Sequence, residues 1–314
     1  MKQKVPIILI VGPTGVGKTE ISVEIALALN TEIINADSRQ IYKLMDIGTA
    51  KPPKALQSKV RHHLIDIIYP DEYFSAGEYG RRAREVILSL WERGMIPLIV
   101  GGSGLYIKAL IYGFFKGSET DQELRESFME YANKIGERSL YERLIKVDPD
   151  AAKRIHPKDT MRIVRALEVY EKTGKPISIL QDNFAMKDSP YRPIMIGLCR
   201  ERKNLYKRID KRVDLMINQG LIDEVKGLLD MGYSEELNSM MGIGYKQIIG
   251  FLKGEYDLNS AIAILKRDSR RYAKRQMTWF RKAEGIEWID VTDNLDDNVR
   301  KILALIHEKT KAKN

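Results

Sequence analysis

Hydrophobic positions in the first 112 residues form short apolar runs, and longer amphipathic stretches separate these runs. The runs are rich in β-branched residues and predict buried strands at 5–11, 32–35, 63–68 and 96–100. Apolar residues at helical spacing between them predict helices over 18–29 and 76–93. Strands that alternate with helices in this way are typical of a parallel sheet covered by helices.

The pattern changes after residue 120, where polar, amphipathic stretches replace the apolar runs. They predict a helical insertion at 121–187, with helices over 121–134, 139–147 and 160–172. The sheet pattern then returns, with strands at 194–198 and 287–291 and helices over 205–231 and 258–282. We therefore expect a core domain made of residues 1–120 and 188–314, and a separate helical domain between these two segments.

A glycine-rich segment follows the first predicted strand and precedes the first predicted helix. It fits the pattern G-x-x-x-x-G-K-[ST] with the residues Gly12, Pro13, Thr14, Gly15, Val16, Gly17, Lys18 and Thr19. The backbone amides of such a loop surround phosphate oxygens, the lysine places a charge on the terminal phosphate, and the threonine hydroxyl suits Mg²⁺. Kinases, ATP-binding NTPases and transferases that release diphosphate could all use it. With the predicted sheet, it indicates an α/β fold of the P-loop NTPase type.

Two polar segments follow later strands of the predicted sheet. Asp37 comes directly after the second strand, at the edge of an open α/β sheet where ligands bind. A role in capping a turn is an equally good interpretation of that residue. Ser103 lies in the turn Gly101-Gly102-Ser103-Gly104, which serves either as a site for its hydroxyl or as a tight connection without chemistry.

The charge distribution favours a polyanionic partner. The net charge is +9, and residues 200–282 contribute +7 of it, with 18 Lys and Arg against 11 Asp and Glu. Basic residues are densest at 266–282, where Tyr272, Trp279 and Phe280 lie between them. A solvated basic helix with these aromatic residues in the core would look the same, and Trp279 and Phe280 fit core positions better than base-stacking positions. The lone Cys199 excludes an internal disulfide and a thiolate metal cluster, and fits a cytoplasmic protein. No apolar stretch approaches the roughly 20 residues that span a bilayer, so no membrane partner is expected.

Seven sequence blocks in one order carry a family resemblance. They are GPTGVGKT at 12–19, NADSRQIYKLMDIGTAKP at 35–52, HHLIDI at 62–67, VGGSGLYIKAL at 100–110, RIHPKDTMRIVRALEV at 154–169, MGIGYKQ at 241–247 and KRQMTWFR at 274–281. With these blocks the chain resembles the tRNA dimethylallyltransferases, also called tRNA isopentenyltransferases. Eukaryotic members commonly add a C-terminal zinc finger, which the single cysteine excludes, so the resemblance is to the short bacterial form.

The resemblance implies a prenyl transfer. A dimethylallyl group would pass from dimethylallyl diphosphate to N6 of the adenosine 3′-adjacent to the tRNA anticodon, forming N6-isopentenyladenosine and releasing diphosphate. The loop at 12–19 would hold the diphosphate, with Mg²⁺ on Thr19. Asp37 corresponds to the family's general base, and Lys18 and Ser103 complete the catalytic set. Apart from the resemblance, Arg208 or Arg212 in the helix after the strand at 194–198 could assist departure of the diphosphate, although ordinary solvated charges on a helix face would look the same.

The resemblance also implies an extensive tRNA-binding surface on a monomer that needs no protein partner. Ser103 stands where many members have threonine, which preserves the hydroxyl. The implied tRNA-binding residues are Asp37, Ser38, Arg39, Gln40, Ser103, Arg125, Met161, Arg162, Ile163, Val164, Arg165, Met241, Gly242, Ile243, Gly244, Tyr245, Lys246, Lys274, Arg275, Gln276, Met277, Thr278, Trp279, Phe280 and Arg281.

Three rival functions remain compatible with parts of the sequence. A P-loop kinase of a nucleotide or small metabolite would use the first 112 residues, but has no use for a basic C-terminal half. A nucleic-acid-binding module without prenyl transfer would explain the charge, but gives Asp37 and Ser103 no chemical task. An enzyme that prenylates free adenine nucleotides would not need the helical insertion.

Overall fold

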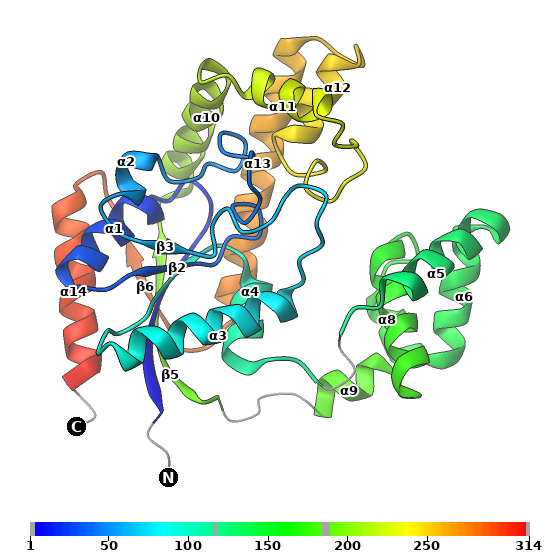
Figure 1. Ribbon diagram of the computed structural model, residues 1–314, viewed down its shortest axis with the longest axis horizontal. Coiled ribbons are helices and arrows are strands. Elements are labelled where there is room, and N and C mark those ends of the chain that lie inside the picture. The colour runs from blue at the N-terminus through cyan, green and yellow to red at the C-terminus, as the bar shows by residue number, and fades with distance from the viewer. Residues whose placement is uncertain (1–3, 116–118, 184–188, 312–314) are drawn as a thin grey trace. The chain divides into compact units, whose positions relative to one another are not determined.

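The computed structural model describes residues 4–115, 119–183 and 189–311 of the chain (Figure 1). The chain divides into two compact units, which we call the core unit, residues 1–111 and 190–314, and the insertion unit, residues 112–189. The sequence placed the insertion at 121–187. The compact unit is wider, because it begins at the end of the helix α4 (Gly104–Tyr112).

The core unit contains a six-stranded parallel sheet with the strand order β3-β2-β4-β1-β5-β6. The strands are β1 (Val5–Val11), β2 (Ile33–Asn35), β3 (His62–His63), β4 (Leu98–Gly101), β5 (Tyr191–Cys199) and β6 (Ile286–Asp290). This architecture confirms the predicted α/β fold of the P-loop NTPase type.

The third strand is shorter than the sequence predicted. An extended segment over 63–68 was expected, but only His62 and His63 pair with β2. Leu64 and Asp66 have φ angles of 59° and 54°, and residues in this region of φ cannot continue a strand. Ile68 then forms an isolated parallel bridge to Tyr42, which lies in the segment after β2 and outside the sheet.

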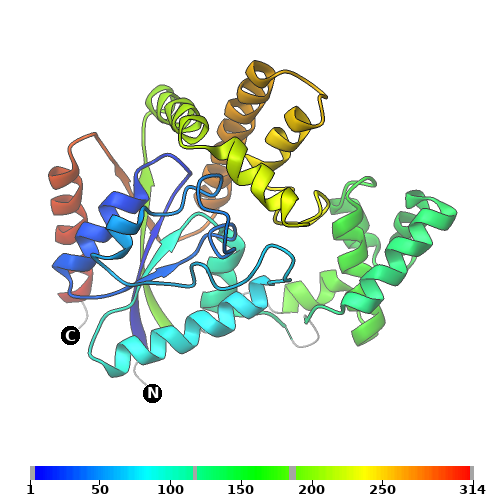
Figure 2. The ribbon, with the colours of Figure 1, turned by 45° about the horizontal axis from the view of Figure 1, so that its top comes forward.

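Helices cover both faces of the sheet, as Figures 1 and 2 show. The central strand β1 is apolar throughout because it is buried on both sides. Ile7 and Leu9 pack with α3 (Ala76–Glu92) and α4, whereas Ile8 and Ile10 pack with α1 (Lys18–Ala28) and α14 (Leu295–Lys311). The remaining helices of this unit are α2 (Lys54–Gln57), α10 (Arg202–Asn218), α11 (Leu221–Asp230), α12 (Tyr245–Leu252) and α13 (Leu258–Arg281).

The helix predicted over 205–231 is in fact two helices. It breaks at Gly220, which has a φ of 95° and separates α10 from α11. Glycine adopts this left-handed conformation without the steric penalty that other residues incur.

Within the described residues, no helix is long and apolar enough to cross a membrane.

The insertion unit is helical, with α5 (Gln122–Ile135), α6 (Glu137–Val147), α7 (Pro149–Arg154), α8 (Thr160–Thr173) and α9 (Ile177–Asn183). Its helices bury a core of their own that includes Phe128, Leu140, Leu144 and Leu167. Asp121, Asp148 and Asp159 cap the N-termini of α5, α7 and α8 by accepting hydrogen bonds from backbone amides. These side-chain caps explain why each helix begins at that residue.

Candidate active site

The phosphate loop connects β1 to α1 at the carboxyl edge of the sheet. Gly12 has a φ of 151°, and a Cβ at this position would lie 2.6 Å from the Leu198 carbonyl oxygen. Gly15 has a φ of 81°, and a Cβ there would lie 2.8 Å from Cγ1 of Ile209. Glycine is therefore required at both positions, because the loop passes directly against β5 and α10.

Lys18 is held inside this loop. Its Nζ donates hydrogen bonds to the carbonyls of Gly12 and Pro13, both at 2.9 Å. Burial lowers the pKa of Lys18 to about 8, and the nearby carboxylate of Asp37 partly opposes that shift. Burial therefore disfavours the charged form of this lysine, and an anion bound beside it would stabilise that form.

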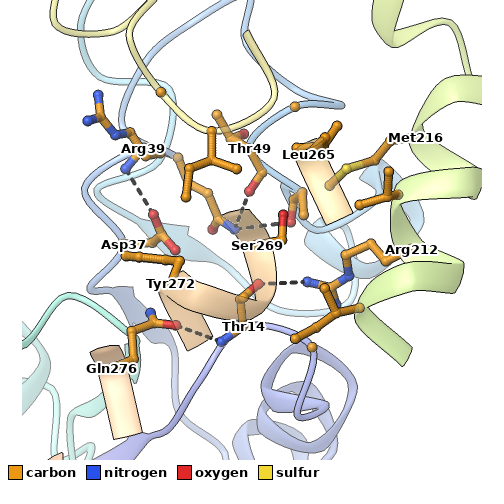
Figure 3. Close-up of a pocket in the computed structure, with 18 of the residues that line it drawn as sticks. Thr14, Asp37, Arg39, Thr49, Arg212, Met216, Leu265, Ser269, Tyr272 and Gln276 are labelled. Carbon is orange, nitrogen blue, oxygen red and sulfur yellow. Dashed lines mark hydrogen bonds between the residues drawn. The ribbon is translucent and has the colours of Figure 1, made fainter. Parts of the chain in front are cut away.

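A cavity of about 410 Å³ opens between the loop, the segment after β2 and the helices α10 and α13 (Figure 3). Its polar side includes Thr14, Lys18, Thr19 and Asp37, and its apolar side is formed by Ile209, Val213, Met216 and Leu265. The volume is in the range of small-molecule sites. A ligand with an anionic end and a short hydrocarbon chain would match both sides.

Asp37 lies where the sequence predicted it, at the end of β2 and in the wall of the cavity. Its Oδ1 accepts a hydrogen bond from the Arg39 amide at 2.9 Å, so the carboxylate also caps a turn (Figure 3). The capping hydrogen bond uses one oxygen of the Asp37 carboxylate, and the side chain still lines the cavity. The two interpretations of Asp37 are therefore compatible.

Ser103 is buried behind the cavity and supports the segment after β2. Its Oγ accepts a hydrogen bond from the Ser38 amide at 2.9 Å and lies 3.1 Å from the Ser38 Oγ. The residues that line the cavity in the described part of the chain do not include Ser103. The hydroxyl thus fixes the backbone next to Asp37.

The structure separates the two arginines that the sequence could not distinguish. Arg212 lines the cavity, and its Nη1 lies 3.3 Å from the Thr14 hydroxyl. Arg208 donates through Nε to the Gly15 carbonyl at 3.2 Å and forms an ion pair with Asp293 at 3.1 Å. Arg212 is therefore placed to contact a bound anion, whereas Arg208 lies outside the cavity and holds the phosphate loop through its hydrogen bond to Gly15.

Many of the residues expected to bind tRNA gather at the same cavity. Those that line it are Asp37, Ser38, Arg39, Gln40, Met241, Gly242, Ile243, Lys246, Arg275 and Gln276. Tyr245 and Phe280 are 2% and 0% exposed and pack in the core instead. Tyr245 and Phe280 therefore cannot contact tRNA with their side chains and instead support the exposed residues around them.

Several residues of the insertion unit that were expected to bind tRNA are buried or paired within this unit. Ile163 and Val164 are 1% and 2% exposed and belong to the core of this unit, so their side chains do not face solvent. Arg125 and Arg165 both pair with the fully buried Glu168, at 3.0 and 2.7 Å. The pair of Arg125 with Glu168 joins α5 to α8, whereas the pair of Arg165 with Glu168 lies within α8. Met161 and Arg162 remain exposed.

Sequence reasoning did not single out the segment Gly48–Ala50, which forms part of the cavity wall. Glu224 of α11 fixes this segment by accepting hydrogen bonds from the amides of Asp46, Ile47 and Gly48 at 2.7–3.0 Å. The only sequence signal for 48–50 was that these residues lie in the long family block at 35–52.

The apolar cavity residues of α10 and α13 were not predicted, because their spacing is that of any helix that faces a core.

The donors for a metal ion are oxygen atoms at the loop. Thr19 and Asp37 both line a small space of about 40 Å³ beside Lys18. In the part of the chain that the structure describes, there is no group of three His, Cys, Asp or Glu side chains that could hold a metal ion. The Thr19 hydroxyl fits Mg²⁺, which takes few protein ligands and keeps water and substrate phosphates.

Three comparisons with known proteins bear on this site. The family model of IPP transferase matches residues 40–283. The tRNA dimethylallyltransferase of Thermoanaerobacter sp. (strain X514) is 50% identical over 308 residues, covering 96% of this chain and 98% of that protein. The corresponding protein of Natranaerobius thermophilus is 49% identical over 291 residues, covering 92% of this chain and 87% of its own length.

Solved structures agree with these similarities. A tRNA isopentenylpyrophosphate transferase from Bacillus halodurans has a TM-score of 0.72 at 42% identity, with 99% of each chain covered. A eukaryotic dimethylallyltransferase acting on tRNA has a TM-score of 0.82 at 29% identity, covering 99% of this chain and 80% of its own.

Proposed function

The chain belongs to the IPP transferase family, and we propose that it transfers a dimethylallyl group from dimethylallyl diphosphate to N6 of the adenosine 3′-adjacent to the tRNA anticodon. One observation carries the proposal. A single cavity joins a phosphate loop, a carboxylate at the end of β2 and an apolar wall from α10 and α13. These three parts match a diphosphate, a nucleophile that must lose a proton, and a five-carbon chain.

In the proposed reaction, N6 of adenine attacks C1 of the dimethylallyl group while the bond from C1 to the diphosphate oxygen breaks. The Asp37 carboxylate accepts a proton from N6, which makes the nitrogen lone pair available. Lys18, Arg212 and the loop amides stabilise the negative charge that develops on the departing diphosphate. The adenine has to leave its stack to enter the cavity, so base flipping is part of the proposal.

We include Mg²⁺ in this proposal, and the Thr19 hydroxyl would hold it. When bound, the ion would neutralise charge on the leaving group. The protein's own contribution is to place Thr19 at the start of α1, next to the cavity.

A direct assay tests the proposed function. Labelled dimethylallyl diphosphate is supplied with Mg²⁺ in buffer free of ATP, together with tRNA, with AMP or with neither. We expect labelled product with tRNA alone. An absolute requirement for ATP, or a phosphorylated product, would favour the kinase, and product with AMP would favour an enzyme of free nucleotides.

The basic outer side of α13 should bind RNA phosphates. Arg271 and Lys274 are exposed there, and we expect the double change Arg271→Ala and Lys274→Ala to raise the KM for tRNA. Each lost phosphate contact should reduce the slope of log K against log salt by roughly 0.7–0.9. The KM for dimethylallyl diphosphate should change much less than the KM for tRNA.

The matched control for this prediction removes the same charge elsewhere. Lys301 is exposed and Lys309 is half-buried on α14, and each pairs with an acidic residue. Replacing both by alanine should leave the salt slope of tRNA binding as it is in the wild type. Equal slopes for all three proteins would mean that Arg271 and Lys274 are only a solvated surface.

A further inference from the structure

Gln276 connects the basic helix α13 to the phosphate loop. The residue is 6% exposed, and its Oε1 accepts a hydrogen bond from the Thr14 amide at 2.8 Å (Figure 3). Its Nε2 donates to the Gly102 carbonyl at 3.0 Å. A single side-chain amide of α13 thus bridges the loop after β1 and the turn after β4.

The turn after β4 is shaped to receive α13. A Cβ at Gly102 would lie 2.2 Å from the Nε2 of Gln276, and a Cβ at Gly104 would lie 2.3 Å from the ring of Trp279. The absence of side chains at these two positions allows the helix to approach the turn closely. Both glycines therefore serve the docking of α13.

The other side of the same helix is exposed and basic. Arg271 and Lys274 are exposed there and lie within one and a half turns of Gln276. Under the proposed function this side meets RNA phosphates. A displacement of α13 by bound RNA would therefore reach the Thr14 amide through a single hydrogen bond.

We propose that Gln276 is a positioning residue that couples RNA binding on α13 to diphosphate binding in the phosphate loop. This inference rests on the proposed function. If RNA changes the affinity for diphosphate, diphosphate changes the affinity for RNA by the same factor, because the two are linked thermodynamically. Coupling between sites is typically about 5–150-fold.

The test measures this coupling factor by binding, without turnover. The dissociation constant of inorganic diphosphate with Mg²⁺ is determined with and without saturating anticodon stem-loop RNA, for the wild type and for Gln276→Met. We expect a factor of at least about fivefold for the wild type. We expect a factor near one for Gln276→Met, which keeps the length of the side chain but can neither accept from Thr14 nor donate to Gly102.

A second variant perturbs the same contact from the opposite side. Gly102→Ala should displace the Gln276 amide, because the new Cβ would overlap the end of that flexible side chain. It leaves α13 unaltered and should reduce the coupling factor as Gln276→Met does. It also serves if Gln276→Met fails to fold.

The matched control removes a comparable hydrogen bond far from the cavity wall. Thr31 is also 6% exposed, and its Oγ1 donates to the Ile96 carbonyl at 2.8 Å. Thr31→Val should lower stability but keep the coupling factor of the wild type.

Two results would overturn the inference: a wild-type coupling factor of one, or full coupling in both Gln276→Met and Gly102→Ala. Neither result depends on prenyl transfer. Failure of the proposed function would appear separately, as absence of labelled tRNA in the wild-type assay.

Discussion

Asp37→Asn should lower kcat by about 10²–10⁴, the contribution typical of a positioned general base. The asparagine Oδ1 can still accept the hydrogen bond that the Arg39 amide donates to Asp37, so the turn is preserved while the base is lost. Asp37→Ala removes both. The affinity for tRNA should change much less than kcat in either variant, because proton transfer acts in the transition state.

The measurement is single-turnover transfer with saturating tRNA and dimethylallyl diphosphate, together with tRNA binding. If the capping role were the important one, Asp37→Asn would behave like the wild type and only Asp37→Ala would be impaired. Equal losses in both variants would identify the carboxylate itself as the essential group.

Lys18→Met should reduce kcat by about 10²–10³, the cost typical of removing one donor that stabilises developing negative charge. The wild type should also lose affinity for diphosphate as the pH rises through about 8, because burial lowers the pKa of Lys18 to that value. Below this pH the lysine is charged and attracts the anion, and above it the lysine is neutral. A bound anion raises this pKa, so the decline reflects the free protein.

Diphosphate binding can be followed from about two pH units below this pKa to about two units above it. Lys18→Met is the control, because any pH dependence that it retains belongs to the ligand or to other groups. A wild-type profile parallel to that of Lys18→Met would show that Lys18 does not control the pH dependence.

Much of the fold was predictable because β1 and its loop carry strong local signals. An apolar run of seven residues is buried on both faces of the sheet, and the phosphate-loop pattern marks the junction of a strand and a helix. The prediction was wrong at 63–68, where positive φ angles at Leu64 and Asp66 end the strand. It was also wrong at Gly220, because apolar periodicity continues through the break between α10 and α11.

The site was predictable only in part, since its walls come from distant segments. Asp37 and Lys18 each follow a strand, so topology brings them to one edge. Met216 and Leu265 belong to two helices whose periodicity shows that they face inward, but not that they line a cavity. The contact of Gln276 with Thr14 spans 262 positions of sequence, and no local pattern reports a contact of this kind.

The order of the strands has a consequence for synthesis on the ribosome. β1 is made first, but one of its two neighbours in the sheet is β5, which begins at Tyr191. Until the ribosome has passed that residue, one edge of the most apolar strand has no partner, and an unpaired edge of this kind promotes aggregation. The insertion unit has its own core, so it can fold before β5 is made and while that edge of β1 is still unpaired. Codon changes that slow translation between β4 and β5 should therefore reduce the yield of soluble protein.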